Sequence, residues 1–299
     1  MKNIDFSSKH DIWLQNWDGT LKRMDEPYYE TEKVAEGTWK IFSSGDFSYL
    51  AEGDQKAIAI DTGYGAGNIR AYMQTLTDKP LTEVINTHDH FDHTANNGYF
   101  DRAYMGEKTV PLATVPFPSF KGIDFPQDYE RIAVGDGYVF DLGGRTLEVF
   151  SIPDHAAGSI ALLDRKERIL FSGDEYTPGG KRLNGGLITF AENLQKVRAH
   201  RDEFDRLCGG PVCMTDASLI DQLWECVQFI LAGHEGSEPE PGAPLPLPKS
   251  PDDQGRTVYH RQLPHPEDMK HDGENTAACW RSVTYAGVTI TYDLNKKDQ

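Results

Sequence analysis

A chain of 299 residues is long enough to bury a large core, and α/β units of this size are commonly a single domain. Its formal net charge of −17 argues against nucleic acid and anionic membranes as partners, because both are bound through clustered Lys and Arg side chains. No apolar run approaches the roughly 18 residues of a membrane-spanning helix. The N-terminus lacks an apolar segment with a cleavage site, so we expect a cytoplasmic protein.

The first half of the chain is expected to form strands around one helix. Residues 1–33 are polar, with interspersed aromatic side chains, and predict an irregular strap ahead of the first strand. Apolar runs and alternating patterns then predict a helix at residues 67–77 and strands at residues 38–42, 47–52, 57–60 and 82–87.

The second half predicts further strands, two helices and a terminal hairpin. In chain order these elements cover residues 134–150, with a turn at Gly143 and Gly144, then 160–163, 168–171, 190–207, 219–231 and the hairpin formed by 282–285 and 288–292.

Two segments are rich in proline. Residues 109–130 also carry several aromatic side chains, and they predict either a wall over an active site or an ordinary connection whose rings pack on the core. Residues 235–256 predict a loop or linker. We therefore expect one domain at residues 1–235, and at residues 236–299 an extension whose hairpin packs on that same domain.

Five metal-capable side chains fall within six positions directly after the strand predicted at 82–87, namely His88, Asp89, His90, Asp92 and His93. Alternate residues of an extended chain point the same way, so His88 and His90 can converge on one ion. Asp92 and His93 lie in the following turn and can face a second ion. Imidazole together with carboxylate suits zinc, iron or manganese rather than calcium.

This His-x-His-x-Asp-His string resembles the signature of the metallo-β-lactamase superfamily, and three other blocks fit that family in the same order. Asp61 closes a buried strand, His155 stands within Ile152–Ser159 after a later strand, and Asp174 ends the string Leu170–Asp174. The resemblance covers about residues 35–235. It implies an αββα four-layer sandwich that holds its metals at the open edge between two sheets.

The resemblance also implies a role for each residue. His88, His90 and His155 would hold a first ion, Asp92 and His93 a second, and Asp174 would bridge the two. Asp92 would also orient the nucleophile or protonate the leaving group. Asp61 would fix a ligand histidine through its free ring N–H.

Two features depart from the family pattern. Asp154 replaces the usual glycine before the third histidine, so the hydrogen bonds around His155 are expected to differ. The last histidine of the family is absent from residues 204–212, and the residues left to replace it are Cys213, Asp216, His234 and the tail histidines at 260, 265 and 271. We therefore expect one tightly held ion and a second that is held more weakly.

The chemistry of such a site favours hydrolysis. A bound ion lowers the pKa of a coordinated water towards about 7, which supplies a nucleophile at neutral pH. The resemblance thus predicts a hydrolase with one or two zinc ions, with iron or manganese as alternatives, that cleaves a small ester, thioester, lactone or amide. Its partner would be a small-molecule substrate, and a homo-oligomer stays open.

The main alternative belongs to another class. A mononuclear iron oxidoreductase of the persulfide-dioxygenase kind needs two histidines and a carboxylate, which His88, His155 and Asp174 could provide. A binding protein without catalysis is a third interpretation, because one ligand block of the family is missing.

Overall fold

The computed structural model describes residues 12–15, 21–23, 29–43, 46–63, 68–113, 128–239, 257–260 and 279–297. Several predictions therefore fall outside the described residues. These are most of the strap, residues 114–127 and 240–256 of the proline-rich segments, and the histidines at 265 and 271.

Two large sheets form the centre of the described chain. The first runs in the order β3 (Glu30–Ala35), β4 (Thr38–Ser43), β5 (Asp46–Glu52), β6 (Ala57–Ile60), β7 (Leu81–Ile85), β8 (Arg102–Gly106) and β9 (Glu130–Val134). The second runs in the order β10 (Val139–Asp141), β11 (Thr146–Ser151), β12 (Ile160–Asp164), β13 (Ile169–Gly173), β15 (Arg206–Gly209) and β16 (Cys213–Asp216).

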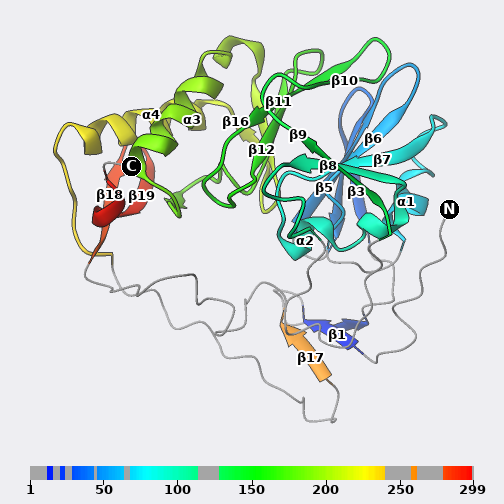
Figure 1. Cartoon of the computed structure of the whole chain (residues 1–299), viewed down its shortest axis with the longest axis horizontal. Coiled ribbons are helices and arrows are strands. Elements are labelled where there is room, and N and C mark those ends of the chain that lie inside the picture. The colour runs from blue at the N-terminus through cyan, green and yellow to red at the C-terminus, as the bar shows by residue number, and fades with distance from the viewer. Residues whose placement is uncertain are drawn as a thin grey trace.

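The helices cover the outer faces of these sheets (Figure 1). They are α1 (Ile69–Met73) and α2 (Phe91–Thr94) on the first sheet, and α3 (Leu187–Arg198) and α4 (Ser218–Leu231) on the second. Side chains of both sheets share one buried cluster, in which Ile58 and Ile60 of β6 pack with Phe171 of β13. The predicted αββα sandwich is confirmed.

Smaller sheets complete the described residues. The order β14 (Gly180–Arg182), β19 (Val288–Asp293) and β18 (Trp280–Tyr285) joins the terminal hairpin to the middle of the chain. Val283, Val288 and Ile290 of that hairpin belong to the same buried cluster as Leu223 of α4. The backbone of β17 (Thr257–His260), β1 (Ile12–Gln15) and β2 (Leu21–Arg23) forms another sheet.

Three of the predicted elements are wrong in extent. The helix expected at 67–77 is limited to Ile69–Met73 in the described residues. The helix expected at 190–207 ends at Arg198, and Arg206–Gly209 is a strand that pairs in parallel with β13. Phe204 and Leu207 are both buried, and their positions happen to continue the apolar spacing of the helix. They are buried in a loop and in a strand instead. The irregular strap was predicted to extend to residue 33, which is too far. Glu30–Ala35 is a strand that pairs with β4 at the edge of the first sheet.

None of the described helices has both the length and the apolar character that crossing a membrane requires.

The buried guanidinium of Arg145 joins the two sheets. Its Nε donates to Asp164 Oδ2 at 2.8 Å, within the second sheet, and its Nη1 donates to the carbonyl oxygens of Gly37 at 2.7 Å and Glu52 at 3.0 Å. Both charged side chains are almost fully buried, at 1% and 0% exposed. Loss of one partner would leave the other charge buried without compensation.

We predict that Arg145→Met lowers the free energy of unfolding by about 3–5 kcal/mol, the usual loss when a buried ion pair is broken. Urea unfolding followed by circular dichroism measures the change. The control is Arg102→Met, which removes an exposed pair with Glu130 and should cost no more than about 1 kcal/mol. Equal losses in the two variants would show that Arg145 does not join the sheets as described.

Candidate metal centre

The site lies where several strands end at one edge of the sandwich. β6 and β7 are parallel, so Asp61 and His88, which follow them, lie at the same edge. β13 ends at Gly173, directly before Asp174. The backbone N–H of Ile160, at the start of β12, donates to the carbonyl oxygen of Thr87 at 2.8 Å and ties the second sheet to this edge. Loops from both sheets therefore deliver side chains to one place.

Three histidines form the first group that could hold a metal. One ring nitrogen from each of His88, His90 and His155 lies within 4.8 Å of the other two. His155 Nε2 is 3.0 Å from His90 Nδ1, and His88 is only 1% exposed. The structure thus brings together the three histidines that were expected to share one ion.

Two further groups overlap the first. His88, His93 and Asp174 form one, and His93 Nε2 lies 3.3 Å from Asp174 Oδ1. Asp92, His93 and Asp46 form the other, with His93 Nε2 3.9 Å from Asp92 Oδ2. Asp46 was not a candidate in the sequence, and Asp89 of the predicted cluster belongs to none of these groups.

The residues fit a divalent metal ion. His88 Nε2, His93 Nε2 and Asp174 Oδ1 are buried side-chain atoms without a hydrogen-bond partner. Buried polar atoms are normally satisfied, so atoms left in this way around one point indicate a ligand that binds among them. Neutral imidazole and ionised carboxylate are also the donor set that zinc, iron and manganese take.

The protonation states agree with this interpretation. Burial, together with the neighbouring His93 and His90, lowers the pKa of His88 well below its usual value. Burial also lowers the pKa of His155 to about 3, so both rings are neutral at pH 7. For Asp174, burial raises the pKa, but His93, His155 and His90 together lower it more, so the carboxylate stays ionised. Metal ligands must be deprotonated in the same way.

His93 differs because carboxylates surround it. Burial lowers the pKa of its ring, but Asp174, Asp61 and Asp92 together raise that pKa well above its usual value. This part of the site therefore attracts a positive charge.

Asp61 fixes the conformation of the loop that carries His88 and His93. Its backbone has φ of 57°, a left-handed conformation that Asp tolerates better than most residues. The carboxylate accepts hydrogen bonds from the Thr87 backbone N–H at 2.8 Å and the Thr87 hydroxyl at 2.7 Å. The same carboxylate lies 2.9 Å from His93 Nδ1, which leaves Nε2 of that ring to face the site.

A buried ion triad that sequence reasoning missed supports the loop of His155. Lys181 Nζ lies 2.8 Å from Asp154 Oδ2 and 2.9 Å from Glu175 Oε1. Glu175 Oε2 accepts the backbone N–H of His155 at 2.8 Å, so the triad anchors the loop that carries this histidine. Asp154, which stands where the family usually has glycine, is one member of this triad.

Three of the residues considered as replacements for the missing histidine lie outside the metal-capable groups. Asp216 pairs with Arg206, at the far end of the β15–β16 ladder from Gly209, and its carboxylate accepts the backbone N–H of Ser218. The ring of His234 stacks on Phe229 with centroids 3.8 Å apart. Cys213 Sγ lies 3.8 Å from Cys208 Sγ. Among the described residues, none of these three belongs to a metal-capable group.

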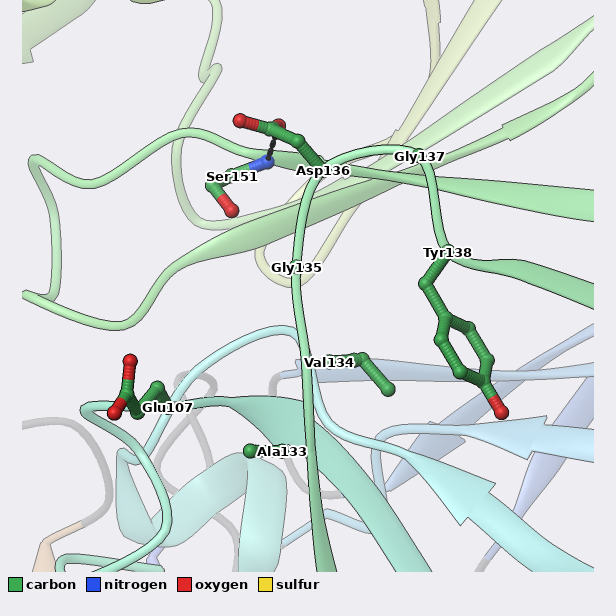
Figure 2. Close-up of a pocket in the computed structure, with 8 residues that line it drawn as sticks. All are labelled: Glu107, Ala133, Val134, Gly135, Asp136, Gly137, Tyr138 and Ser151. Carbon is green, nitrogen blue, oxygen red and sulfur yellow. Dashed lines mark hydrogen bonds between the residues drawn. The ribbon is translucent and has the colours of Figure 1, made fainter.

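Two pockets differ in their relation to this centre. The larger, of about 560 Å³, lies around the β9–β10 turn (Figure 2), with Glu107, Asp136 and Ser151 on its wall. It contains no side chain of the metal-capable groups, so its size does not make it the reaction site. The smaller, of about 310 Å³, is lined by His155 and Asp174 together with Arg182 and Asn184. This smaller pocket opens on the candidate ligands.

Comparison with known proteins gives the family. The family model described as the metallo-beta-lactamase superfamily matches residues 45–210, more than half of the chain. This chain belongs to the metallo-β-lactamase superfamily. The resemblance read from its four motif blocks is confirmed. A metallo-β-lactamase from Erythrobacter litoralis has a similar fold, with a TM-score of 0.54, 15% identity and coverage of 67% of this chain and 96% of that one.

Curated relatives point to hydrolases. The human acyl-coenzyme A thioesterase MBLAC2 is 27% identical over 189 residues, which are 51% of this chain and 68% of the relative. An atrochrysone carboxyl ACP thioesterase of Aspergillus fumigatus is 24% identical, over 52% of this chain and 47% of its own length. The α subunit of a 2,4-dinitroanisole O-demethylase from a Nocardioides species is 31% identical, over 52% and 48%. The chain is thus a hydrolase of the metallo-β-lactamase fold.

We predict that Asp61→Asn weakens zinc binding by about 10- to 100-fold, the range found for groups that orient a metal ligand. Asn tolerates the left-handed backbone of this position, so the variant tests the carboxylate and not the turn. Competition with a chromophoric chelator measures the affinity. The control is Asp101→Asn, an exposed carboxylate near Arg70, and unchanged affinity in both variants would remove the role given to Asp61.

Proposed function

We propose that this chain is a metal-dependent thioesterase that cleaves a small acyl thioester at the candidate metal centre. The observation that carries the proposal is the convergence of His88, His90 and His155 beside His93 and Asp174. Within this cluster the buried Nε2 atoms of His88 and His93 have no hydrogen-bond partner. The names of the relatives from human and Aspergillus fumigatus support the thioester as the substrate class.

The ligand assignment follows the three groups. His88, His90 and His155 would hold the first ion, Asp92 and His93 would contribute to a second, and Asp174 would face both. We favour zinc because it suits imidazole and carboxylate ligands on rigid strand ends, and iron or manganese would accept the same donors. When bound, the metal supplies Lewis acidity and a nucleophilic water at neutral pH.

Asp92 is the residue best placed to move a proton. Its side chain is partly exposed, at 16%, and its Oδ2 lies 3.9 Å from His93 Nε2 within one of the metal-capable groups. A carboxylate in this position can take the proton of the attacking water and return it to the departing group. A thiol, with a pKa of about 8.5, leaves with little help from an acid, whereas an amide nitrogen needs full protonation. Thioester cleavage therefore asks less of Asp92 as an acid than amide cleavage does.

The smaller pocket would receive the substrate. Arg182 lies on its wall, with its guanidinium carbon 4.1 Å from the centre of the Trp280 ring. This cation sits in a strongly acidic protein and would attract an anionic carrier group of the substrate, such as a phosphate.

We also propose that residues 1–235 form the catalytic domain and that residues 236–299 pack on it, in a cytoplasmic protein. Pairing of β14 with β19 and the buried contacts between the hairpin and α4 support this division.

We predict that a panel of acyl-coenzyme A thioesters is hydrolysed faster than amides or phosphodiesters, and that metal chelation abolishes the activity. Release of free thiol, followed with a thiol-reactive dye, measures the rate. Turnover of nucleic acid with none of any acyl substrate would contradict the proposal. Oxygen uptake with a persulfide would favour the mononuclear iron oxidoreductase.

We predict that Asp92→Ala lowers turnover by at least about 100-fold, the scale of general acid–base catalysis, while the first ion stays bound. Steady-state kinetics and metal content are measured on the same samples. Asp89→Ala is a matched control, since Asp89 lies in the same loop and in none of the metal-capable groups. Full turnover by Asp92→Ala would remove the role assigned to it.

A further inference from the structure

The loop that lacks the family histidine is packed directly against the metal centre. A Cβ added at Gly210 would meet Asp174 Oδ1 at 2.2 Å and His93 Cε1 at 2.6 Å. Distances this short cannot be kept, so any side chain at Gly210 would displace two of the candidate ligands. A ligand on this side of the site must therefore come from another element.

The start of β5 is the element that lies beside this loop. The backbone N–H of Phe47 donates to the carbonyl oxygen of Gly210 at 2.8 Å, and the Tyr49 hydroxyl donates to that of Gly209 at 2.5 Å. These two bonds fix β5 against the β15–β16 turn. Asp46, the first residue of β5, is consequently held at the edge of the site and is only 3% exposed.

The Asp46 carboxylate faces the same ring as the other acidic side chains. Its ligand oxygen, that of Asp92 and a ring nitrogen of His93 all lie within 4.8 Å of one another. His93 is fully buried, and its Nε2 has no hydrogen-bond partner and lies 3.3 Å from Asp174 Oδ1. A divalent cation among these groups would offset the repulsion between the neighbouring carboxylates of Asp46 and Asp92.

We propose that Asp46 supplies the ligand that replaces the missing histidine, so that a second ion is held by Asp46, Asp92, His93 and Asp174. This inference rests on the proposed metal-dependent function. The first position offers three imidazoles, whereas the second offers the imidazole of His93 with the carboxylates of Asp46 and Asp92. Asp174 approaches the same ring from the neighbouring group, with its Oδ1 3.3 Å from His93 Nε2. Oxygen-rich sites suit manganese better than imidazole-rich sites do, so the two positions prefer different metals.

The test compares metal binding by the full chain and two variants. Protein is stripped with a chelator, reloaded with one equivalent of zinc, and titrated with manganese, whose free and bound forms are separated by electron paramagnetic resonance. The parent should bind one manganese ion per chain. Asp46→Ala and the near-isosteric Asp46→Asn should keep the zinc and bind manganese more weakly by over about 100-fold, a larger loss than orienting groups cause.

Glu52→Gln is the matched control, because it removes one negative charge from the other end of β5. It should bind manganese as the parent does, and thermal unfolding of Asp46→Asn should match that of the parent. Equal manganese affinity in the parent and in both Asp46 variants would overturn the inference and leave the proposed function intact. A parent that binds neither zinc nor manganese would overturn both.

Discussion

The carboxylate of Asp61 is the constraint on which the candidate centre depends. It accepts hydrogen bonds from the backbone and hydroxyl of Thr87 and fixes the His93 ring through Nδ1. Thr87 in turn accepts the backbone N–H of Ile160 from the second sheet. A Cβ added at Gly173 would lie only 2.4 Å from Thr87 Oγ1. The end of β13 therefore packs against Thr87 at a distance that only glycine permits. One buried acid thus connects β6, β7 and the loops that carry His88, His93 and Asp174.

Much of the centre could be predicted because its parts are local. The His88–His93 segment carries its own spacing, and Asp61, His155 and Asp174 each follow a recognisable strand. The individual strands and helices followed from patterns of apolar residues, whereas the αββα sandwich was implied by the family resemblance. The helix predicted at 190–207 was too long because Phe204 and Leu207 continue its apolar spacing. In the structure Phe204 precedes β15 and Leu207 lies within it.

The remainder of the centre depends on contacts between distant segments, which spacing cannot show. Lys181 meets Asp154 and Glu175 only because the three-residue strand β14 returns beneath the His155 loop. Asp46 lies more than 40 residues before His88 in the sequence. It reaches the site because β5 pairs with β6 and bonds to the turn at Gly209 and Gly210.

The terminal hairpin extends the same support beyond residues 45–210, the part that matches the family model. β14 pairs in parallel with β19, where Lys181 lies opposite Ile290. The buried cation that supports the His155 loop, Lys181, therefore lies on a strand that pairs with the terminal hairpin. The terminal hairpin therefore stabilises one side of the centre, although none of its described residues belongs to a metal-capable group.

Anomalous X-ray diffraction from crystals grown without a chelator tests the central claim most directly. If the histidine and carboxylate cluster is a metal centre, a transition-metal peak is expected at bonding distance, about 2.0–2.2 Å, from ring nitrogens of His88, His90 and His155. The absence of any peak, with these rings hydrogen-bonded to one another and to water after soaking in excess zinc, would contradict it.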